Sequence, residues 1–216
     1  MYPCYAGRVS GEPTSSSHLP GDALRLPLHG AEIALYPAVD LGEPAELLAR
    51  LLAEVPWRQE SVTVYGKSHL QPRLIAWYGD PGTDYTYSGV HHAPLPWTPL
   101  LQQLRGAVRS RCDHTFNSVL LNCYRDGNDC MGLHADDEAE LGPHPVIASL
   151  SLGAQRRMYF RSRCKPETPT YSVDLPDSSL LVMSGETQRN WKHGIRRTAR
   201  PCGPRVNLTF RQIYPR

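Results

Sequence analysis

From residue 115 to the C-terminus, short runs of β-favouring residues alternate with turn residues, and this pattern most restricts the fold. Turn pairs such as Asp126-Gly127 and Gly203-Pro204 separate the runs. Many strands at this spacing, without helical periodicity between them, predict an all-β barrel or jelly roll in this half. The runs are FNSVLLNCY, VIASLSLGA, RRMYFR, TYSVDL, SLLVMS, HGI and RVNLTFRQIY.

The N-terminal half has a different texture. Residues 1–22 are rich in Gly, Pro and Ser, which is typical of a flexible tail. Residues 31–40 suggest a first strand, and residues 43–55 carry an apolar stripe at helical spacing. A second helix is expected after Thr98-Pro99, a plausible cap and first helical position.

The chain of 216 residues is long enough for one domain with a buried core. We therefore expect a flexible tail over residues 1–22 and a single domain over residues 23–216. The expected class is α+β, mainly β, with a jelly-roll core at about residues 115–214.

The composition excludes several protein classes. No stretch approaches the ~20 apolar residues of a membrane helix, and the first residues lack the apolar run of a secretory signal. We expect an intracellular protein, cytoplasmic if prokaryotic and nuclear if eukaryotic, that does not bind membranes. The six cysteines form no Cys-x-x-Cys pair, so a cysteine-held metal or a disulfide framework is not expected.

The net charge of +2 says little, but the positive charges are clustered. No acidic residue follows Glu186, although many arginines do. Such clusters can bind a phosphate backbone, or they can be a solvated positive surface, which charge alone favours. A second basic cluster comprises Arg156, Arg157, Arg161, Arg163 and Lys165.

Residues 205–211 alternate in character, which predicts a strand with one apolar and one polar face. The apolar face carries Val206, Leu208 and Phe210. The polar face carries Arg205, Asn207, Thr209 and Arg211. An ordinary half-exposed strand fits this pattern. Alternatively, the two guanidiniums line a barrel interior and hold a dicarboxylate, because the guanidinium fork can bind a carboxylate through two hydrogen bonds.

His134 and Asp136 form a His-x-Asp, whose side chains point the same way in an extended backbone. His193 is the candidate for a third ligand. Two histidines and one carboxylate form the facial triad of non-haem iron(II) oxygenases, which leaves positions open for a co-substrate and dioxygen. Each part alone is common, but a triad followed by the arginine strand is what iron plus 2-oxoglutarate requires.

These residues together resemble the AlkB family. The family pattern of Asn-x-Tyr, His-x-Asp, a distant His and Arg-x-Asn-x-x-x-Arg occurs here in order. The closest resemblance, to the DNA-repair branch, covers residues 115–161 and 204–214, and a weaker one extends it to roughly 33–214. The matching positions are Asn122, Tyr124, His134, Asp136, His193, Arg205, Asn207 and Arg211.

The resemblance implies a double-stranded β-helix with a nucleotide-recognition lid at about residues 57–95. It also implies that His134, Asp136 and His193 hold Fe(II). Arg205, helped by Tyr124, would then bind the distal carboxylate of 2-oxoglutarate. Arg211 and Asn122 would lie at the other end of 2-oxoglutarate, the end that chelates the iron. Asn207 belongs to the same co-substrate motif.

The implied reaction removes alkyl groups from damaged bases such as 1-methyladenine and 3-methylcytosine in DNA. Dioxygen and 2-oxoglutarate are consumed, and carbon dioxide, succinate and formaldehyde are released. The base must leave its stack, or the substrate must be single-stranded. A monomer acting on DNA, and on RNA as an alternative substrate, is expected.

In relatives the base lies between the first iron-ligating histidine and an aromatic residue of the lid, here Tyr87. The resemblance also implies that Tyr85 forms a hydrogen bond nearby, and that Glu138 contacts the base with support from Asp137. Structural roles in a hairpin remain open for both tyrosines.

Arg73 matches a lid arginine near the substrate, with a structural role equally open. The Val64-Tyr65-Gly66 segment lies where duplex-acting relatives carry an apolar wedge, and it either inserts into a duplex or packs on the lid. Two other functions also remain open: a protein or lipid hydroxylase of the same class, and a jelly-roll binding module without catalysis.

Overall fold

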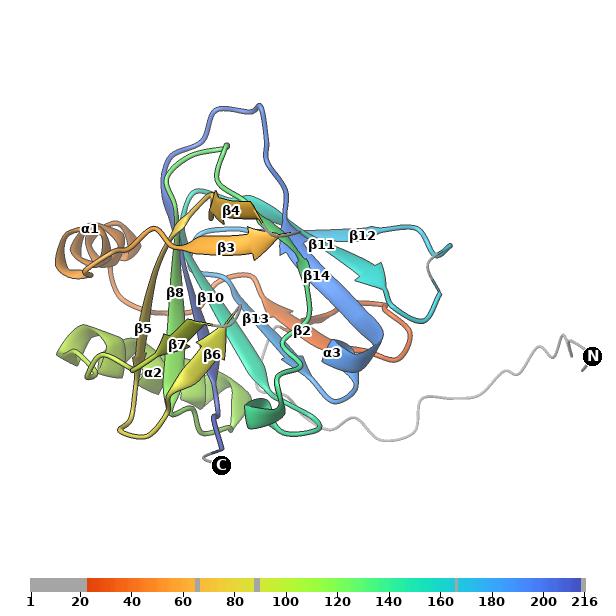
Figure 1. The fold of residues 1–216 in the computed structure, drawn as a ribbon, viewed down its shortest axis with the longest axis horizontal. Coiled ribbons are helices and arrows are strands. Elements are labelled where there is room, and N and C mark those ends of the chain that lie inside the picture. Colours follow the sequence, from red (N-terminus) through yellow and green to blue (C-terminus); the bar gives the residue numbers. More distant parts are fainter. Residues whose placement is uncertain (1–22, 65–66, 88–89, 166, 215–216) are drawn as a thin grey trace, which may run out of the picture.

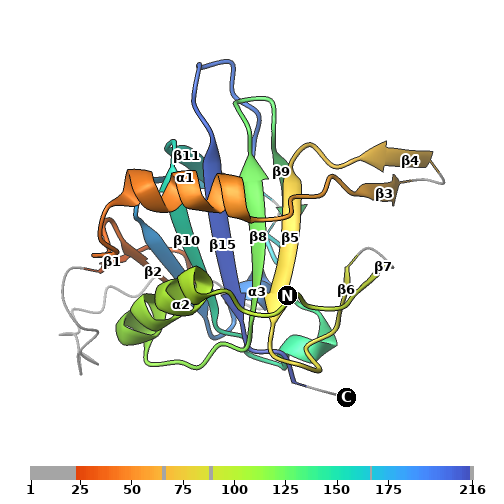
Figure 2. The ribbon, with the colours of Figure 1, turned by 90° about the vertical axis from the view of Figure 1, so that its left-hand side faces the viewer.

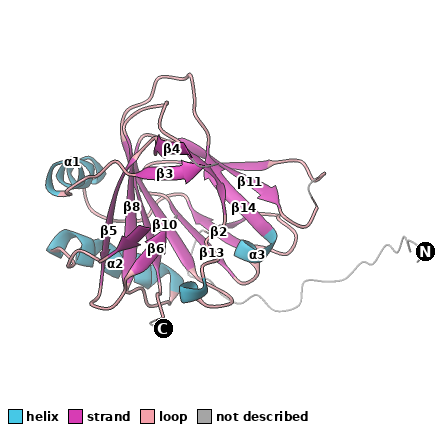
Figure 3. Ribbon diagram, in the orientation of Figure 1, coloured by secondary structure: helices cyan, strands magenta, loops and turns pink. Residues whose placement is uncertain are grey.

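Antiparallel strands dominate the architecture, and helices lie at its periphery (Figures 1 and 3). The computed structural model describes residues 23–64, 67–87, 90–165 and 167–214. The expected tail over residues 1–22 lies outside this part of the chain. No helix in the described ranges is both long and apolar enough to span a bilayer.

The larger sheet has seven strands in the order β1-β2-β13-β10-β15-β8-β5. Every adjacent pair in it is antiparallel. The expected first strand is shorter than residues 31–40 and lies inside this sheet, paired with a strand from the C-terminal half. The strands are β1 (Leu24–Arg25), β2 (Glu32–Tyr36), β5 (Leu74–Gly79), β8 (Ser118–Tyr124), β10 (Ile147–Gly153), β13 (Leu180–Ser184) and β15 (Arg205–Arg211).

The smaller sheet has the order β12-β11-β14-β9. Its strands are β9 (Met131–His134), β11 (Arg156–Ser162), β12 (Tyr171–Leu175) and β14 (Trp191–Ile195). Apolar side chains of both sheets pack between them, among them Phe160 of β11 and Met183 of β13. These two antiparallel sheets confirm the expected mainly β class with a jelly-roll core.

Two helices cover the outer face of the larger sheet (Figure 2). Helix α1 (Pro44–Glu54) begins with a proline, which lacks the N–H that a first turn leaves unpaired. Helix α2 (Pro99–Cys112) is capped by Thr98, whose hydroxyl accepts a hydrogen bond from the Leu101 N–H at 3.2 Å. Both predicted helices are therefore confirmed.

Alternation along the central strands divides the core into two layers. In β15, Val206, Leu208 and Phe210 pack against the helices. The opposite face of β15 points between the two sheets, and no residue of the strand is exposed. The half-exposed interpretation of this strand is therefore wrong, because the helices cover one face and the smaller sheet covers the other.

Two hairpins project from the body beside the edge strand β5 (Figure 2). They are β3 (Ser61–Val64) with β4 (Lys67–Leu70), and β6 (Tyr85–Tyr87) with β7 (Val90–His92). The expected lid range of 57–95 also contains β5, which is buried and belongs to the larger sheet. Tyr65 and Gly66 of the wedge candidate lie outside the described residues.

Candidate active site

The candidate metal ligands come from the smaller sheet. His134 at the end of β9 and His193 in β14 are directly paired across the two strands, with ring centroids 4.4 Å apart. Asp136 follows β9 after one intervening residue. The candidate ligand atoms of all three residues lie within 4.8 Å of one another. The structure thus brings together the residues that the sequence predicted as a triad.

Both carboxylate–imidazole distances in this cluster suit one shared ion. Asp136 Oδ1 lies 3.8 Å from His134 Nε2, and Asp136 Oδ2 lies 3.7 Å from His193 Nε2. Ligands with bonds of about 2.1 Å to one metal can be up to roughly 4.2 Å apart. Burial and the neighbouring His134 lower the pKa of His193 to about 3, so its imidazole is neutral, as a metal ligand must be.

Asp136 is buried and charged. Burial by itself raises the pKa of Asp136, but Arg211 and the two histidines together hold that pKa below its ordinary value. Arg211 Nη2 donates to Asp136 Oδ1 at 2.7 Å. The other oxygen, Oδ2, is buried and accepts no hydrogen bond from the described residues. A divalent cation would satisfy this oxygen.

Arg205 is the largest fully buried side chain of the described chain. Its Nη2 donates to Ser151 Oγ at 2.9 Å, and its guanidinium carbon lies 5.2 Å from the centroid of the Tyr124 ring. Arg205 Nε and Nη1 are buried without a hydrogen-bond partner in the described structure. Burial lowers the pKa of Arg205 to about 10, so the group remains a cation near neutral pH.

One pocket joins this cation to the metal cluster. It is lined by the three candidate ligands, by Arg205 and Arg211, and by the predicted co-substrate residues Asn122, Tyr124 and Asn207. A buried cation with unpaired donors requires an anion, and a dicarboxylate whose other end chelates a metal supplies one. The residues present therefore fit both Fe(II) and 2-oxoglutarate.

Asn207 lines the pocket, but its hydrogen-bonding groups are engaged by the protein. Its Nδ2 donates to Ser149 Oγ at 2.8 Å and to the Leu150 carbonyl at 3.0 Å. Its Oδ1 accepts from Thr209 at 2.9 Å. Asn207 therefore links β15 to β10 within the wall of the pocket.

A second cavity of about 140 Å³ lies beside the metal pocket, between β5 and the segments that flank it. Leu120 lines both this cavity and the metal pocket. Arg73 also lines this cavity, and its Nε donates to Asn122 Oδ1 at 2.8 Å. The structure thus places the predicted lid arginine against Asn122, a predicted co-substrate residue.

Of the other residues predicted to contact the base, the structure describes the side chains of Asp137 and Glu138 but not those of the two tyrosines. Tyr85 and Tyr87 belong to β6 and pair with β7, but their side chains are outside the described part of the structure. Asp137 is half-exposed and forms an ion pair with Arg163 at 2.6 Å. Glu138 is partly buried and precedes the short 3-10 helix η1 (Ala139–Leu141).

Sequence reasoning missed three residues that support the site. Gln188, in the short helix α3 (Thr187–Asn190), accepts a hydrogen bond from the Asp136 N–H at 3.0 Å. Ser149 and Ser151 of β10 anchor Asn207 and Arg205. The sequence could have indicated the two serines, since they share one face of a strand whose other face is apolar. Gln188 had none, because nothing local links it to Asp136.

Comparison with known proteins identifies the family. The model of the 2OG-Fe(II) oxygenase superfamily matches residues 40–211. The chain is 42% identical over 194 residues to mouse alpha-ketoglutarate-dependent dioxygenase alkB homolog 3, covering 86% of this chain and 67% of the relative. The chain belongs to the AlkB family of 2OG-Fe(II) oxygenases. Its cofactor and co-substrates are therefore Fe(II), 2-oxoglutarate and dioxygen.

Other relatives of this AlkB-family oxygenase agree. It is 46% identical over 158 residues to human DNA oxidative demethylase ALKBH2, covering 70% of this chain and 60% of the relative. The solved structure of OsALKBH1 superposes with a TM-score of 0.62 at 17% identity, covering 88% of this chain and all of that one. At that identity the superposition establishes the shared fold alone.

Proposed function

We propose that this chain oxidatively removes alkyl groups from damaged bases in DNA. The observation that carries the proposal is the convergence of His134, Asp136 and His193 beside the buried guanidiniums of Arg205 and Arg211. When bound, Fe(II), dioxygen and 2-oxoglutarate supply the oxidation of the N-alkyl carbon, with release of carbon dioxide, succinate and formaldehyde. The protein binds these groups, orients the base and limits access of water.

The triad holds the iron, and the two arginines divide the co-substrate between them. Arg205, beside Tyr124, binds the distal carboxylate through the unpaired Nε and Nη1. Arg211 contacts Asp136 and so lies at the end where 2-oxoglutarate chelates the metal, with Asn122 on the same pocket wall. Asn207 acts indirectly, because its carboxamide is engaged by β10 and Thr209.

The damaged base enters past the cavity beside β5 and reaches the iron across Leu120. There it lies between His134 and Tyr87, with Tyr85, Asp137 and Glu138 around it. Arg73 borders the same route. The DNA substrate is supported by the curated relatives named DNA oxidative demethylase. We further propose that the enzyme acts as a monomer, in whichever compartment holds the DNA.

RNA demethylation is the second candidate, since a base removed from its stack can be bound from either polymer. A protein or lipid hydroxylase of the same class is a further alternative, but the relatives named DNA oxidative demethylase support a nucleic-acid substrate instead. A binding module without catalysis is inconsistent with family membership and with the intact triad.

The decisive experiment is mass spectrometry of oligonucleotides that carry 1-methyladenine, 3-methylcytosine or an etheno adduct. Each is offered as single-stranded DNA, duplex DNA and RNA, with succinate measured in parallel. We expect loss of the alkyl mass from at least one DNA substrate, with one succinate per repaired base. Turnover of a peptide or lipid but of no oligonucleotide would refute the proposal.

The control for this experiment is Asp136→Ala. It removes the carboxylate between the two histidines and should abolish both repair and uncoupled 2-oxoglutarate turnover. Unchanged activity in that variant would remove Asp136 from the metal site.

A further inference from the structure

Arg73 joins the cavity beside β5 to the co-substrate pocket. It immediately precedes β5, so its side chain lies on the same face as Ile75 and Trp77, which point between the sheets. Only 4% of Arg73 is exposed, and arginine is rarely buried to this extent unless its polar atoms are paired. Asn122 is paired with Ile75 on the neighbouring strand, so Arg73 reaches it diagonally across the β5–β8 pair.

The contact determines which end of the Asn122 carboxamide is available. Arg73 Nε donates to Asn122 Oδ1 at 2.8 Å, and both residues are buried. The carboxamide has one acceptor oxygen and one donor NH2 group. With its oxygen held by Arg73, Asn122 can offer only its NH2 donors to the pocket that it lines. A carboxylate requires donors, whereas a flipped carboxamide would present an oxygen and repel it.

We propose that Arg73 is a positioning residue for 2-oxoglutarate, which holds the Asn122 carboxamide with its donors directed to the co-substrate. This inference rests on the proposed role of Asn122 in the co-substrate pocket. It differs from the base contact expected for Arg73, because the effect is present without any nucleic acid. Arginine suits the task since its Nε lies along the side chain, whereas lysine carries donors only at its tip.

The direct test is the dissociation constant of 2-oxoglutarate in Arg73→Lys, measured by calorimetry with Mn²⁺ in place of iron and without nucleic acid. Lysine retains the charge but loses the Nε–H that engages Asn122. We expect roughly tenfold weaker binding, the size of a lost hydrogen bond to a charged group. Binding as tight as in the wild type would overturn the proposal.

The matched control is Arg105→Lys on α2. Arg105 is a partly buried arginine, with its guanidinium 4.3 Å from the Trp97 ring centroid and 3.4 Å from Asp80, but it lines neither cavity. Its 2-oxoglutarate dissociation constant should equal that of the wild type. An equal weakening in both variants would show a general loss of structure and overturn the positioning role.

A double-mutant cycle separates positioning from the role of Asn122 itself. If Arg73 acts through Asn122, then Arg73→Lys in an Asn122→Ala background causes no further weakening of 2-oxoglutarate binding. Additive effects overturn the positioning role and leave the proposed pocket intact. No effect of Asn122→Ala alone overturns the role of Asn122, and with it this inference.

Asn122→Asp keeps the test informative if Arg73→Lys does not fold. Aspartate retains an oxygen for Arg73 but replaces the NH2 donors by a second acceptor. We expect a folded protein, judged by its thermal unfolding, that binds 2-oxoglutarate at least tenfold more weakly. Wild-type affinity in this variant would show that the donors are not used.

Discussion

At the scale of single residues, Arg205 shows how the site is prepared for its anion. The guanidinium of Arg205 is only 1% exposed, and two of its nitrogen atoms lack hydrogen-bond partners among the described residues. Its desolvation free energy is therefore unfavourable in the protein without a bound anion. Binding a carboxylate there would relieve this free-energy cost, so we expect the affinity for 2-oxoglutarate to depend on Arg205 more than on surface cations. The burial of Arg205 would strengthen its interaction with a bound carboxylate.

Arg205→Ala should therefore raise the KM for 2-oxoglutarate while leaving the metal ligands in place. Loss of a charge-assisted hydrogen bond costs ~1.5–3 kcal/mol, which corresponds to about one to two powers of ten. Uncoupled succinate formation at varied 2-oxoglutarate measures this change. Arg50→Ala, an exposed arginine paired with Glu54 on α1, is the control. An unaltered KM in Arg205→Ala would contradict the assignment.

At the scale of elements, the short helix α3 connects two of the metal ligands. It follows β13 and leads directly into β14, which carries His193. Its Gln188 accepts the Asp136 N–H at 3.0 Å, and the Gln188 carbonyl accepts from Arg163 at 2.9 Å. Arg163 also forms the ion pair with Asp137. The helix thus holds the loop after β9 against the strand that supplies the third ligand.

Gln188→Ala should weaken metal binding, because the Asp136 peptide loses its acceptor and the loop gains freedom. We expect a severalfold larger Mn²⁺ dissociation constant, together with a loss of about 1–3 kcal/mol in the free energy of unfolding. Calorimetry and urea unfolding measure the two quantities. Arg189→Ala, at the exposed neighbouring position on α3, should change neither. Unchanged Mn²⁺ affinity in Gln188→Ala would exclude the positioning role of α3.

The turn between β8 and β9 contains an ion pair with a defined pH dependence. Burial tends to raise the pKa of Asp129, but hydrogen bonds from the Arg125 side chain and backbone lower that pKa below its ordinary value. A depressed pKa in the folded state stabilises the protein above the ordinary carboxyl pKa. This contribution is lost as the pH falls through the lower, folded-state value.

Asp129→Asn should therefore be less stable than the wild type at about pH 7, and the difference should shrink below about pH 4. Urea unfolding of both proteins across this range measures the free energies. Asp174→Asn provides the comparison, since Asp174 pairs with Arg157 on a more exposed part of β12. A difference between wild type and Asp129→Asn that stays constant with pH would contradict the assigned shift.

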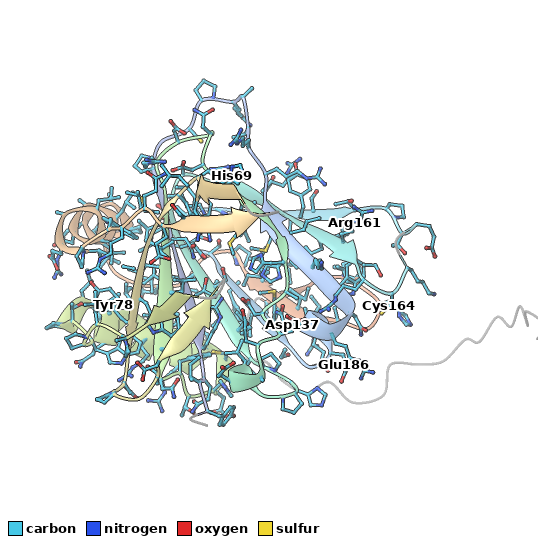
Figure 4. All side chains as sticks on the ribbon, in the orientation of Figure 1. His69, Tyr78, Asp137, Arg161, Cys164 and Glu186 are labelled. Atoms are coloured by element: carbon cyan, nitrogen blue, oxygen red, sulfur yellow. The ribbon has the colours of Figure 1, made fainter. Side chains whose placement is uncertain are left out.

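At the scale of the whole molecule, the positive charges are unevenly engaged. In the second basic cluster, Arg156 is buried and donates to three backbone carbonyls, and Arg157 and Arg163 form ion pairs. Arg161 is exposed on the smaller sheet (Figure 4). It is paired across β11 and β14 with Lys192, which is also exposed. This pair, rather than the cluster as a whole, is the better candidate for a phosphate contact.

Arg161→Gln combined with Lys192→Gln should weaken DNA binding at all sequences and flatten its salt dependence. Each lost phosphate contact reduces the slope of log Kd against log salt by about 0.9 for duplex DNA. Fluorescence anisotropy over a salt series measures it. Uncoupled 2-oxoglutarate turnover should not change, since both side chains point away from the pocket. An unchanged slope would leave the pair as a solvated surface.

Sequence patterns predicted the elements of the fold well because they depend on neighbours in the chain. Thr98-Pro99 begins α2, and the alternation in residues 205–211 is the alternation of β15. The positions of the family motif likewise located the triad. The lid range of 57–95 stays a prediction; within it, the continuous apolar run of β5 lies between two hairpins and joins the larger sheet.

The sequence by itself determined the strands, the two main helices and the candidate side chains for iron and 2-oxoglutarate, since each follows from local spacing and residue chemistry. Only the tertiary structure decided that helices cover one face of β15, that Gln188 supports Asp136 and that Arg73 holds Asn122 across 49 residues of chain. Such contacts depend on how sheets and strands pack against each other. No periodicity within one segment encodes that packing.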